Sequence, residues 1–315
     1  MKKYRFVVLM GVLFCLFSGS AYGNDSSVIA PLVTRSLLLD VVRAGNDLVA
    51  VGERGHVLRS ENNGASWEQV QVPTRATLTS VFFIDPSHGW IVGHDQVILR
   101  SGDGGRNWEQ VYINIAAEAP LLDIIFLDSK HGYAIGAYGQ FLESFDGGSN
   151  WQGRWISEDD FHLNQIIVVG EQLFIAAEAG YAYRSVDGGQ NWELLNPDYM
   201  GSFFGIFATP DNNLLLFGLR GHLFRSADSG TSWVAIKTST EASLTCGVYL
   251  QDGSLGIAGL AGALIHSSDD GKSFILQQDA GRKGFSSLVQ AADGAIIAVG
   301  DFGVAKIELA SGGRI

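Results

Sequence analysis

The sequence repeats one eight-residue pattern six times at nearly constant spacing. The pattern is Ser-x-Asp-x-Gly-x-x-Trp, with small changes in some copies. Its copies begin 41, 43, 41, 41 and 41 residues apart, at Ser60, Ser101, Ser144, Ser185, Ser226 and Ser267. A period near 40 residues indicates a repeat architecture rather than an irregular globular core.

The residue types within this pattern predict a rigid hairpin loop. A short carboxylate can accept bonds from backbone amides two or three residues on, and the glycine reaches backbone angles that other residues adopt only at a cost. The aromatic ring can then fold back under the loop, where its burial fastens the hairpin to its neighbours. The pattern resembles the Asp box of sialidase-like propellers. We expect its polar and aromatic positions to be structural rather than catalytic or calcium-binding, and these positions are Asn62, Trp67, Asp103, Trp108, Asp146, Trp151, Asp187, Trp192, Asp228, Trp233, Asp269 and Phe274.

The N-terminus has the features of a secretory signal peptide. Three basic residues precede an apolar run over 6–17, and Ala21-Tyr22-Gly23 offers small residues at a cleavage site, which predicts a signal peptide over residues 1–23 and a periplasmic location. The apolar run is too short for a permanent membrane anchor, so a peripheral protein is expected. Removal of the three basic residues lowers the net charge from −12 to −15. Such an acidic protein is a poor partner for nucleic acid or anionic membranes.

Each repeat also contains two further apolar segments joined by a glycine-containing turn. With the segment that leads into the box they make three short strands, and a fourth strand follows the box. Seven such meanders occur, although only six carry a box. We therefore predict an all-β fold over residues 24–315, a seven-bladed β-propeller. The apolar stretch Val28 to Leu32 is predicted to close the ring as the outer strand of the last blade, paired with Gly303 to Ile307.

The strand order determines which loops share a face of such a propeller. The boxes and the turns between strands one and two lie on one rim. The turns between strands two and three lie on the opposite face, together with the connections from blade to blade. These turns vary while the frame is constant, which is typical of a scaffold that presents recognition loops. The predicted partner-binding residues are Arg54, His94, Tyr138, Glu178, Arg220 and Phe302. The alternative is that these loops are merely solvated.

The first strands are expected to place one residue each at an equivalent level around the axis. These residues are Asp40, Ser80, Asp123, Gln165, Gly205, Cys246 and Ser287. Two carboxylates could hold a cation or water, but without histidine or further ligands they make a poor metal site, so we favour small polar residues filling a wet channel. Cys246, the one cysteine outside the signal peptide, is interpreted as a strand residue rather than a reactive thiol. No metal ion and no cofactor is predicted.

Two repeats carry a family resemblance. Leu78-Thr79-Ser80-Val81-Phe82-Phe83-Ile84-Asp85 followed by His88-Gly89-Trp90-Ile91-Val92-Gly93, and the equivalent run from Leu122 to Gly136, resemble repeats of the photosystem II stability and assembly factor family. This resemblance implies a non-catalytic factor that assists a membrane protein complex, in the periplasm or, in a photosynthetic organism, in the thylakoid lumen. In other bacteria it suggests an envelope complex as partner, for example an RND-type exporter. The protein itself is expected to be a monomer.

The alternative function is a glycan-binding protein or a glycoside hydrolase of the sialidase type. A sialidase would need three arginines around a carboxylate and an Arg-Ile-Pro segment before the first box, and the sequence has no such segment. Another glycosidase would need two facing carboxylates. The candidates by position are Glu53, Asp95, Glu178 and Asp301, and nothing in the sequence pairs them.

Overall fold

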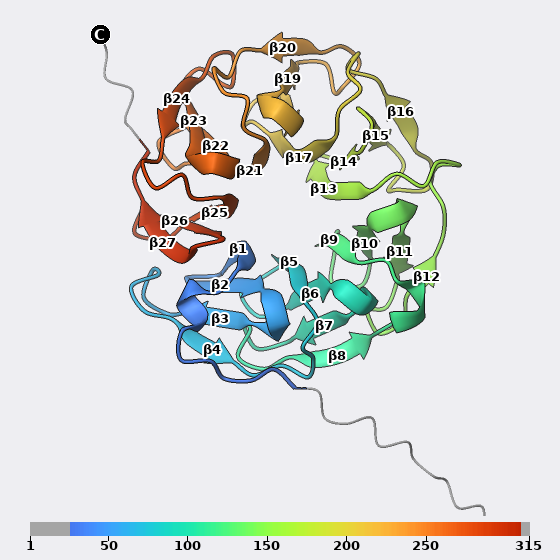
Figure 1. Ribbon diagram of the computed structural model, residues 1–315. Helices are drawn as coiled ribbons and strands as arrows, with labels where there is room; N and C mark the ends of the chain where they lie inside the picture. Colours follow the sequence, from blue (N-terminus) through green and yellow to red (C-terminus); the bar gives the residue numbers. More distant parts are fainter. Residues whose placement is uncertain (1–25, 310–315) are drawn as a thin grey trace, which may run out of the picture.

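The computed structural model describes residues 26–309, which form a ring of seven antiparallel sheets (Figure 1). The predicted seven-bladed propeller is therefore confirmed. The predicted signal peptide lies outside the described residues. Within residues 26–309, no helix is long and apolar enough to cross a membrane.

Six blades have four strands in simple meander order, and blade seven has three. Blade one consists of β1 (Leu38–Ala44), β2 (Asp47–Gly52), β3 (Val57–Ser60) and β4 (Glu68–Val70). Blade two consists of β5 (Leu78–Phe83), β6 (Gly89–Gly93), β7 (Ile98–Ser101) and β8 (Glu109–Tyr112). Blade three consists of β9 (Leu121–Phe126), β10 (Gly132–Gly136), β11 (Phe141–Ser144) and β12 (Gln152–Gly153). Blades four and five consist of β13 (Leu163–Val169), β14 (Gln172–Ala177), β15 (Ala182–Ser185) and β16 (Glu193–Leu195), then β17 (Phe203–Ala208), β18 (Leu214–Gly218), β19 (Leu223–Ser226) and β20 (Val234–Ile236). Blades six and seven consist of β21 (Leu244–Tyr249), β22 (Leu255–Gly259), β23 (Ala263–Ser267) and β24 (Ile275–Gln278), then β25 (Phe285–Gln290), β26 (Ile296–Gly300) and β27 (Gly303–Ile307).

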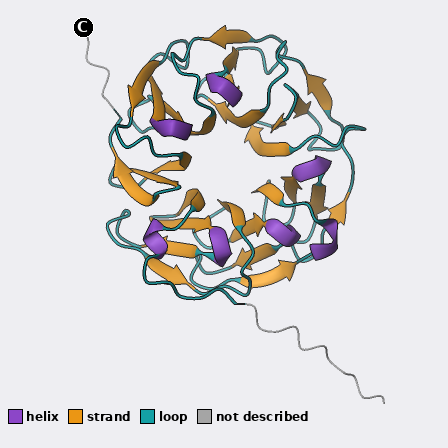
Figure 2. Cartoon of the chain, in the orientation of Figure 1, coloured by secondary structure: helices purple, strands orange, loops and turns teal. Residues whose placement is uncertain are grey.

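Seven short 3-10 helices join these strands in the described part of the chain, and Figure 2 shows them in purple between the orange strands. They are η1 (Val33–Arg35), η2 (Glu53–Gly55), η3 (His94–Gln96), η4 (Ile115–Ala117), η5 (Ala137–Gly139), η6 (Leu219–Gly221) and η7 (Leu260–Gly262).

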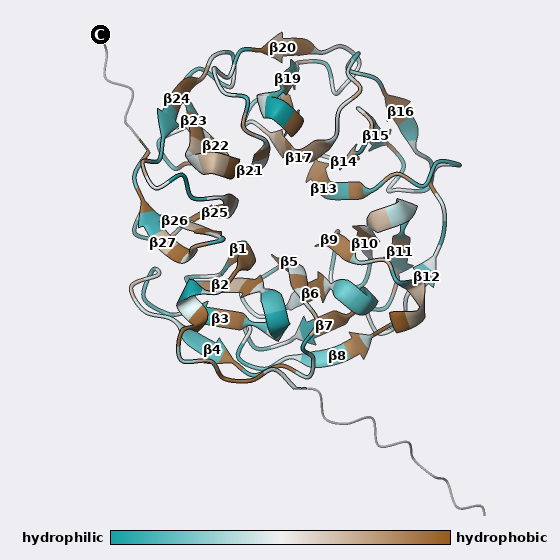
Figure 3. Ribbon diagram, in the orientation of Figure 1, coloured by the Kyte–Doolittle hydropathy of each residue, from teal (hydrophilic) through white to brown (hydrophobic). Residues whose placement is uncertain are grey.

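The core lies in the packed faces between neighbouring blades. The second strands are its centre: β6, β10, β18, β22 and β26 are buried along their whole length. They read as continuous apolar runs because both of their faces meet another blade. Figure 3 shows the hydrophobic colouring on many of the strands and hydrophilic colouring on connections such as η2 and η3.

A glycine at the end of the second strand makes room for the first strand of the same blade. At Gly52 a Cβ atom would lie 2.2 Å from the carbonyl oxygen of Leu37, so no larger residue fits without moving the backbone. A Cβ atom at Gly93 or Gly136 would likewise lie 2.2 Å from the equivalent carbonyl oxygen of the same blade. This close approach coincides with a β-bulge near the start of every first strand.

Polar bonds from one blade to the box of the next reinforce the ring. In four junctions an arginine just before one box donates to a carbonyl oxygen in the loop of the next box. The pairs are Arg59 with Gly104 at 3.1 Å, Arg100 with Gly147 at 3.1 Å, Arg184 with Ser229 at 2.9 Å and Arg225 with Asp270 at 3.0 Å. In blade three the equivalent residue is Glu143, and there Arg154 and the Tyr133 hydroxyl donate to Gly189 and Gly188 instead.

The ring does not close as predicted. The segment from Val28 to Leu32 forms no strand with β27; it runs beside the outer strand of blade one, where the Ser27 amide donates to the Val72 carbonyl at 2.8 Å and Gln69 bonds Val28 and Ala30. The prediction of an N-terminal closing strand is therefore wrong. The reason is physical: Gln69 and Val72 offer this segment polar partners on blade one, which an apolar pattern alone does not reveal.

Side-chain contacts close the ring instead. The Ser287 hydroxyl on β25 donates to the Asp40 carboxylate on β1 at 2.8 Å, and the Ala292 amide donates to the side-chain oxygen of Asn63 at 3.2 Å. Between blades six and seven, where no box aromatic is present, Leu309 packs into the core and occupies the space above Gly256.

Candidate functional site

The six boxes share one hydrogen-bonded geometry, as predicted. In the fourth box the Ser185 hydroxyl donates to Asp187 at 2.8 Å and accepts from the Gly189 amide at 2.8 Å, while Asp187 accepts from the Asn191 amide at 2.9 Å and its side chain at 2.7 Å. The Trp192 indole donates to the Gly189 carbonyl at 3.0 Å. The bonds from Asn191 hold the pKa of Asp187 at about 2, so this side chain is ionised and its carboxylate bonds groups of its own loop.

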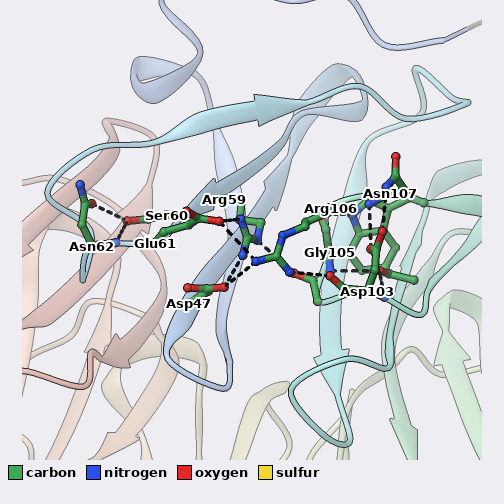
Figure 4. A network of polar contacts seen from close by, with 12 residues as sticks. Asp47, Arg59, Ser60, Glu61, Asn62, Asp103, Gly105, Arg106 and Asn107 are labelled. Carbon is green, nitrogen blue, oxygen red and sulfur yellow. Dashed lines mark hydrogen bonds and ion pairs between the residues drawn. The ribbon is translucent and has the colours of Figure 1, made fainter.

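The box aromatics pack between blades. Trp108 is buried, with 8% of its surface exposed, whereas Trp67, Trp151, Trp192, Trp233 and Phe274 are partly buried. Figure 4 shows the first two boxes with Arg59 between them, bonded to Asp47 and Glu61. The first box keeps the same geometry with Asn62 in place of aspartate, its Oδ1 accepting from the Ser66 amide at 2.8 Å. These loops are therefore built to hold the blades together.

The turns between strands one and two lie against the boxes, as expected. The amide of Gly104 donates to the carbonyl of Ser87, and that of Gly147 to the carbonyl of Lys130, both at 2.9 Å. The turns between strands two and three instead bond the connections between blades, for example the Gly55 amide to the Ala76 carbonyl at 2.9 Å. We call this second surface the loop face, and it comprises residues 53–55, 94–96, 137–139, 178–180, 219–221, 260–262 and 301–302 with the adjoining connections between blades.

One position recurs in the turns of the loop face. In six of the seven turns the central residue has a positive φ between 53° and 59°; these residues are Arg54, Asp95, Tyr138, Ala179, Arg220 and Ala261. This left-handed backbone costs a non-glycine residue about 1 kcal/mol, yet the residue type varies from alanine to arginine. The backbone of the turn is thus constant while the side chain that it presents changes from blade to blade.

The six predicted partner-binding residues all lie on the loop face but differ in how far their side chains are exposed. Arg54, His94, Tyr138 and Arg220 are exposed, whereas Glu178 and Phe302 are partly buried and make contacts within the protein. Glu178 accepts from the His162 amide at 3.1 Å and pairs with its ring. Phe302 packs edge-to-face on Phe285, with the Lys283 ammonium 5.1 Å from its ring centre.

Several exposed apolar side chains on the same face escaped the sequence prediction. Trp155 is 64% exposed and packs against Gly139, and Met200 is 92% exposed. Ile115 in η4 and Leu260 in η7 are also exposed. The signal that could have found them is their position in turns or in connections between blades, where an apolar residue has no sheet to pack into.

Charge on the loop face is distributed unevenly, in two arcs. Exposed or partly exposed cations form a basic arc over blade one, its two adjoining connections, blade five and the connection between blades six and seven, with Glu241 and Asp301 among them: Arg35, Arg54, Arg75, Arg220, Arg282 and Lys283. Acidic residues gather in blades two to four: Asp95, Glu118, Glu158, Asp159, Asp160 and Glu178. A groove of about 440 Å³ adjoins the basic arc, between Arg220 and Glu241, with Phe224 and Ile236 on its floor.

The axial ring is formed as predicted. Asp40 accepts from the Val81 amide of the next blade at 2.9 Å, Asp123 accepts from the Ile166 amide at 2.9 Å, and the Ser80 hydroxyl lies between the two carboxyl groups, at 3.3 and 2.8 Å. These contacts give both carboxylates a structural role between blades. Within residues 26–309 no group of three or more His, Cys, Asp or Glu side chains is placed to hold a metal ion.

Burial changes the protonation chemistry of this ring. Burial raises the pKa of Asp123 to about 7, and the negative charge of Asp40 adds to the shift. Burial also raises the pKa of Asp40, and it raises the pKa of the Cys246 thiol to about 12, so that thiol is a poor nucleophile. On the box side of the ring the channel widens to a cavity of about 690 Å³, lined by apolar residues such as Phe82, Ile125 and Ile167.

The carboxylates considered for glycoside hydrolysis are mostly engaged in holding loops. Glu53 accepts from the Leu37 amide at 3.2 Å, Asp301 accepts from the Gly284 amide at 3.0 Å, and Glu178 is bonded to His162. Asp95 is exposed at the centre of η3. Each of the four belongs to a different blade.

Comparisons with known proteins agree with this architecture. A family model described as "Photosynthesis system II assembly factor YCF48" matches residues 59–119 and 108–248. Among solved structures, "YCF48 bound to D1 peptide" is 21% identical, with 90% of this chain and 96% of that chain covered and a TM-score of 0.71. "YCF48 from Cyanidioschyzon merolae" is 18% identical, with 87% and 96% covered and a TM-score of 0.69.

A further structural neighbour is a streptogramin B lyase, 11% identical, with 89% and 95% covered and a TM-score of 0.75. At these identities the structural likenesses show the fold alone, which serves unrelated functions. No protein of curated function matches the sequence. The family model is more specific, because its matches together span residues 59–248, more than half of the chain. The chain therefore belongs to the family of the photosynthesis system II assembly factor YCF48.

Proposed function

We propose that this protein is a non-catalytic docking platform that binds a subunit of a membrane protein complex through its loop face and assists the assembly or function of that complex. The observation that carries the proposal is the repeated left-handed turn, which presents Arg54, Tyr138 and Arg220 on a constant backbone. Membership of an assembly-factor family supports it, as does a neighbouring structure of a YCF48 protein with a bound peptide.

The composition of the loop face suits protein recognition. Tyrosine, tryptophan and arginine are enriched among the residues that dominate binding energy at interfaces. Tyr138 and Trp155 lie in the acidic arc, and Arg220 lies at the groove of the basic arc. A partner segment with complementary charges would associate faster at low salt than at high salt.

The site of action proposed here is the periplasm, or the thylakoid lumen in a photosynthetic organism, and the protein would act there as a monomer. An RND-type exporter stays a prediction, and we propose only the broader class of envelope or membrane complexes. A glycan-binding or hydrolytic role is the second candidate. It is less well supported because Glu53, Glu178 and Asp301 already bond the loops that carry them.

Triple substitution of Arg54, Tyr138 and Arg220 by alanine tests the proposal. Alanine occupies the same left-handed position in two natural turns, at Ala179 and Ala261, so the variant should fold normally. We expect it to lose the membrane-complex subunits that copurify with the wild-type protein after cross-linking in intact cells.

The matched control is Val186→Ser, which changes an exposed residue within a box, on the opposite rim. This variant should retain the same partners. Undiminished recovery of the subunits by a folded triple variant would contradict docking through the loop face, and turnover of a sialoside or another glycan would contradict a non-catalytic role.

A further inference from the structure

Blade seven has an open position where every other blade has a fourth strand. Its sheet consists of β25, β26 and β27, while each of the other six sheets has four strands. The fourth strands elsewhere are two to four residues long. An unpaired strand edge presents backbone donors and acceptors that readily pair with another extended chain.

The pairing of β26 with β27 shows which groups face the open edge. Gly300 pairs with Gly303 across a two-residue turn, and Ala298 pairs with Ala305. Because hydrogen-bonded and non-bonded pairs alternate in an antiparallel ladder, the intervening Val304 and Lys306 direct their amides and carbonyls away from β26. Within the described residues, no backbone bond joins these groups to another segment.

The described ends of the chain are held elsewhere. The N-terminal segment bonds blade one through Ser27 and Ala30, and η1 packs against the first part of β27, where the Thr34 carbonyl approaches Gly303 and Val33 packs in one cluster with Val304. After β27, the Glu308 carbonyl accepts from Gln277 of blade six at 3.1 Å and Leu309 enters the core between blades six and seven. Within the described residues, neither segment makes a backbone hydrogen bond to Val304 or Lys306.

An exposed apolar side chain lies near the start of this edge. Leu32 immediately precedes η1 and is 65% exposed, and Val33 of η1 packs in one cluster with Val304. Val28 and Ile29 are more than half exposed but lie beside blade one, where Val28 bonds Gln69. Figure 1 shows this dark blue segment passing beside β4 toward η1. Apolar residues next to unpaired backbone groups are what an added strand with apolar side chains would cover.

We propose that the open edge of β27 is a second docking site, which accepts a short extended segment of a partner protein as the fourth strand of blade seven. Blade one indicates the sequence that fits, because its third strand carries Val57 at the position of Val304, and Val57 pairs with Val70. The accepted segment therefore carries an apolar residue opposite Val304. The edge strand has only five residues, which suits a peptide better than the large interface of a stable dimer of this chain.

The test uses a synthetic peptide with the sequence of residues 66–72, Ser-Trp-Glu-Gln-Val-Gln-Val, which contains the natural fourth strand of blade one. Hydrogen exchange of the Val304 and Lys306 amides is measured with and without this peptide. We expect fast exchange of both amides in the free protein and strong slowing on addition of the peptide. A peptide with lysine in place of the first of its two valines should give no slowing.

Two variants at one position separate backbone pairing from side-chain contacts. Lys306→Pro removes an outward amide but is tolerated on a strand edge, so the variant should fold and lose peptide protection at Val304. Lys306→Ala keeps the amide and should still be protected. Equal peptide binding by the proline variant, or no slowing in the wild type at millimolar peptide, would overturn the proposal.

The free protein gives a further check. If both amides are already protected without peptide, independently of concentration, the chain itself fills the position; if the protection grows with protein concentration, a second copy does. Either result overturns the proposal. The loop-face variant with Arg54, Tyr138 and Arg220 replaced should bind the peptide normally, so that failure of one site is distinguishable from failure of the other.

Discussion

At the scale of single residues, aspartate has two opposite roles in this propeller. On the exposed box loops, hydrogen bonds from Asn191 keep Asp187 ionised, with its pKa near 2. In the axial ring, burial favours the neutral form of Asp123 and raises its pKa to about 7. The same side chain therefore stabilises a loop as an anion and joins two blades in a place where an anion is disfavoured.

The Asp123 carboxyl group of the axial ring should make the stability of the protein depend on pH. Between about pH 4 and 7 the folded protein binds a proton at Asp123 that the unfolded chain releases, so this group's contribution to the free energy of unfolding falls as pH rises through that window. Carbon-13 NMR should show Asp123 titrating near pH 7. Urea unfolding between pH 5 and 8 should show a flatter profile for Asp123→Asn than for the wild type. The variant keeps one of the two oxygens that accept from Ile166 and Ser80, so its stability is compared by pH dependence and not by absolute value. A carboxyl titration near pH 4 would contradict this assignment.

At the scale of the element, the Asp box works as a clamp between blades, and its aromatic residue is the part that differs most in burial. Trp108 lies in the core between blades one and two and contacts Phe83 edge-to-face at 5.8 Å between ring centres. Trp192 occupies the equivalent place between blades three and four but is more exposed. Equivalent positions in the repeat therefore need not contribute equally to stability.

This difference can be measured. Trp108→Ala should lower the free energy of unfolding by about 3 to 5 kcal/mol, the range for deleting a buried aromatic, and Trp192→Ala should lower it by less. Chemical denaturation of the two variants, with Arg220→Ala as an exposed control that should unfold like the wild type, provides the comparison. Equal losses for both tryptophans would show that exposure of the ring does not limit its contribution.

Most of the architecture could be predicted from the sequence because the boxes recur at a fixed spacing and their chemistry is local. The rim, the loop face and the axial level of Asp40 and Asp123 follow from strand order alone. The closure could not be predicted in this way. It depends on whether Val28 to Leu32 meets β27 or Gln69 of blade one, and the choice is made by side-chain partners distant in sequence.

The candidate site was predicted less completely than the fold. Arg54, Tyr138 and Arg220 are exposed at the expected turns, because the turn position follows from the repeat. Trp155 and Met200 lie in connections without a repeated pattern, so their exposure depends on the path of the chain. The internal contacts of Glu178 and Phe302 likewise arise from residues outside the repeat, His162 and Lys283.

At the scale of the whole molecule, the ring is not uniform. From blade one to blade six, each junction of neighbouring blades has an arginine on one side and a box loop on the other, and in blade three this arginine is Arg154. Among the described residues, only blade seven lacks both a box and a fourth strand. Its connection to blade one combines the bonds of Ser287 to Asp40 and of Ala292 to Asn63 with the packing of Trp67 against Ile297 and Ala291. Its junction with blade six has no box aromatic, and Leu309 fills that place instead. A ring with one weaker junction opens there first, because local opening follows the lowest local stability.

Native-state hydrogen exchange should therefore find its least protected strand amides in β25 to β27. Asn63→Ala removes the bond to the Ala292 amide and should speed exchange in blade seven while leaving β13 to β16, on another part of the ring, unchanged. Ser229→Ala is the control. Arg184 donates to the backbone carbonyl of Ser229, which alanine keeps, so hydrogen exchange should be unchanged in all blades. Uniform protection around the ring, or acceleration in all blades by Asn63→Ala, would show instead that the propeller opens as one cooperative unit.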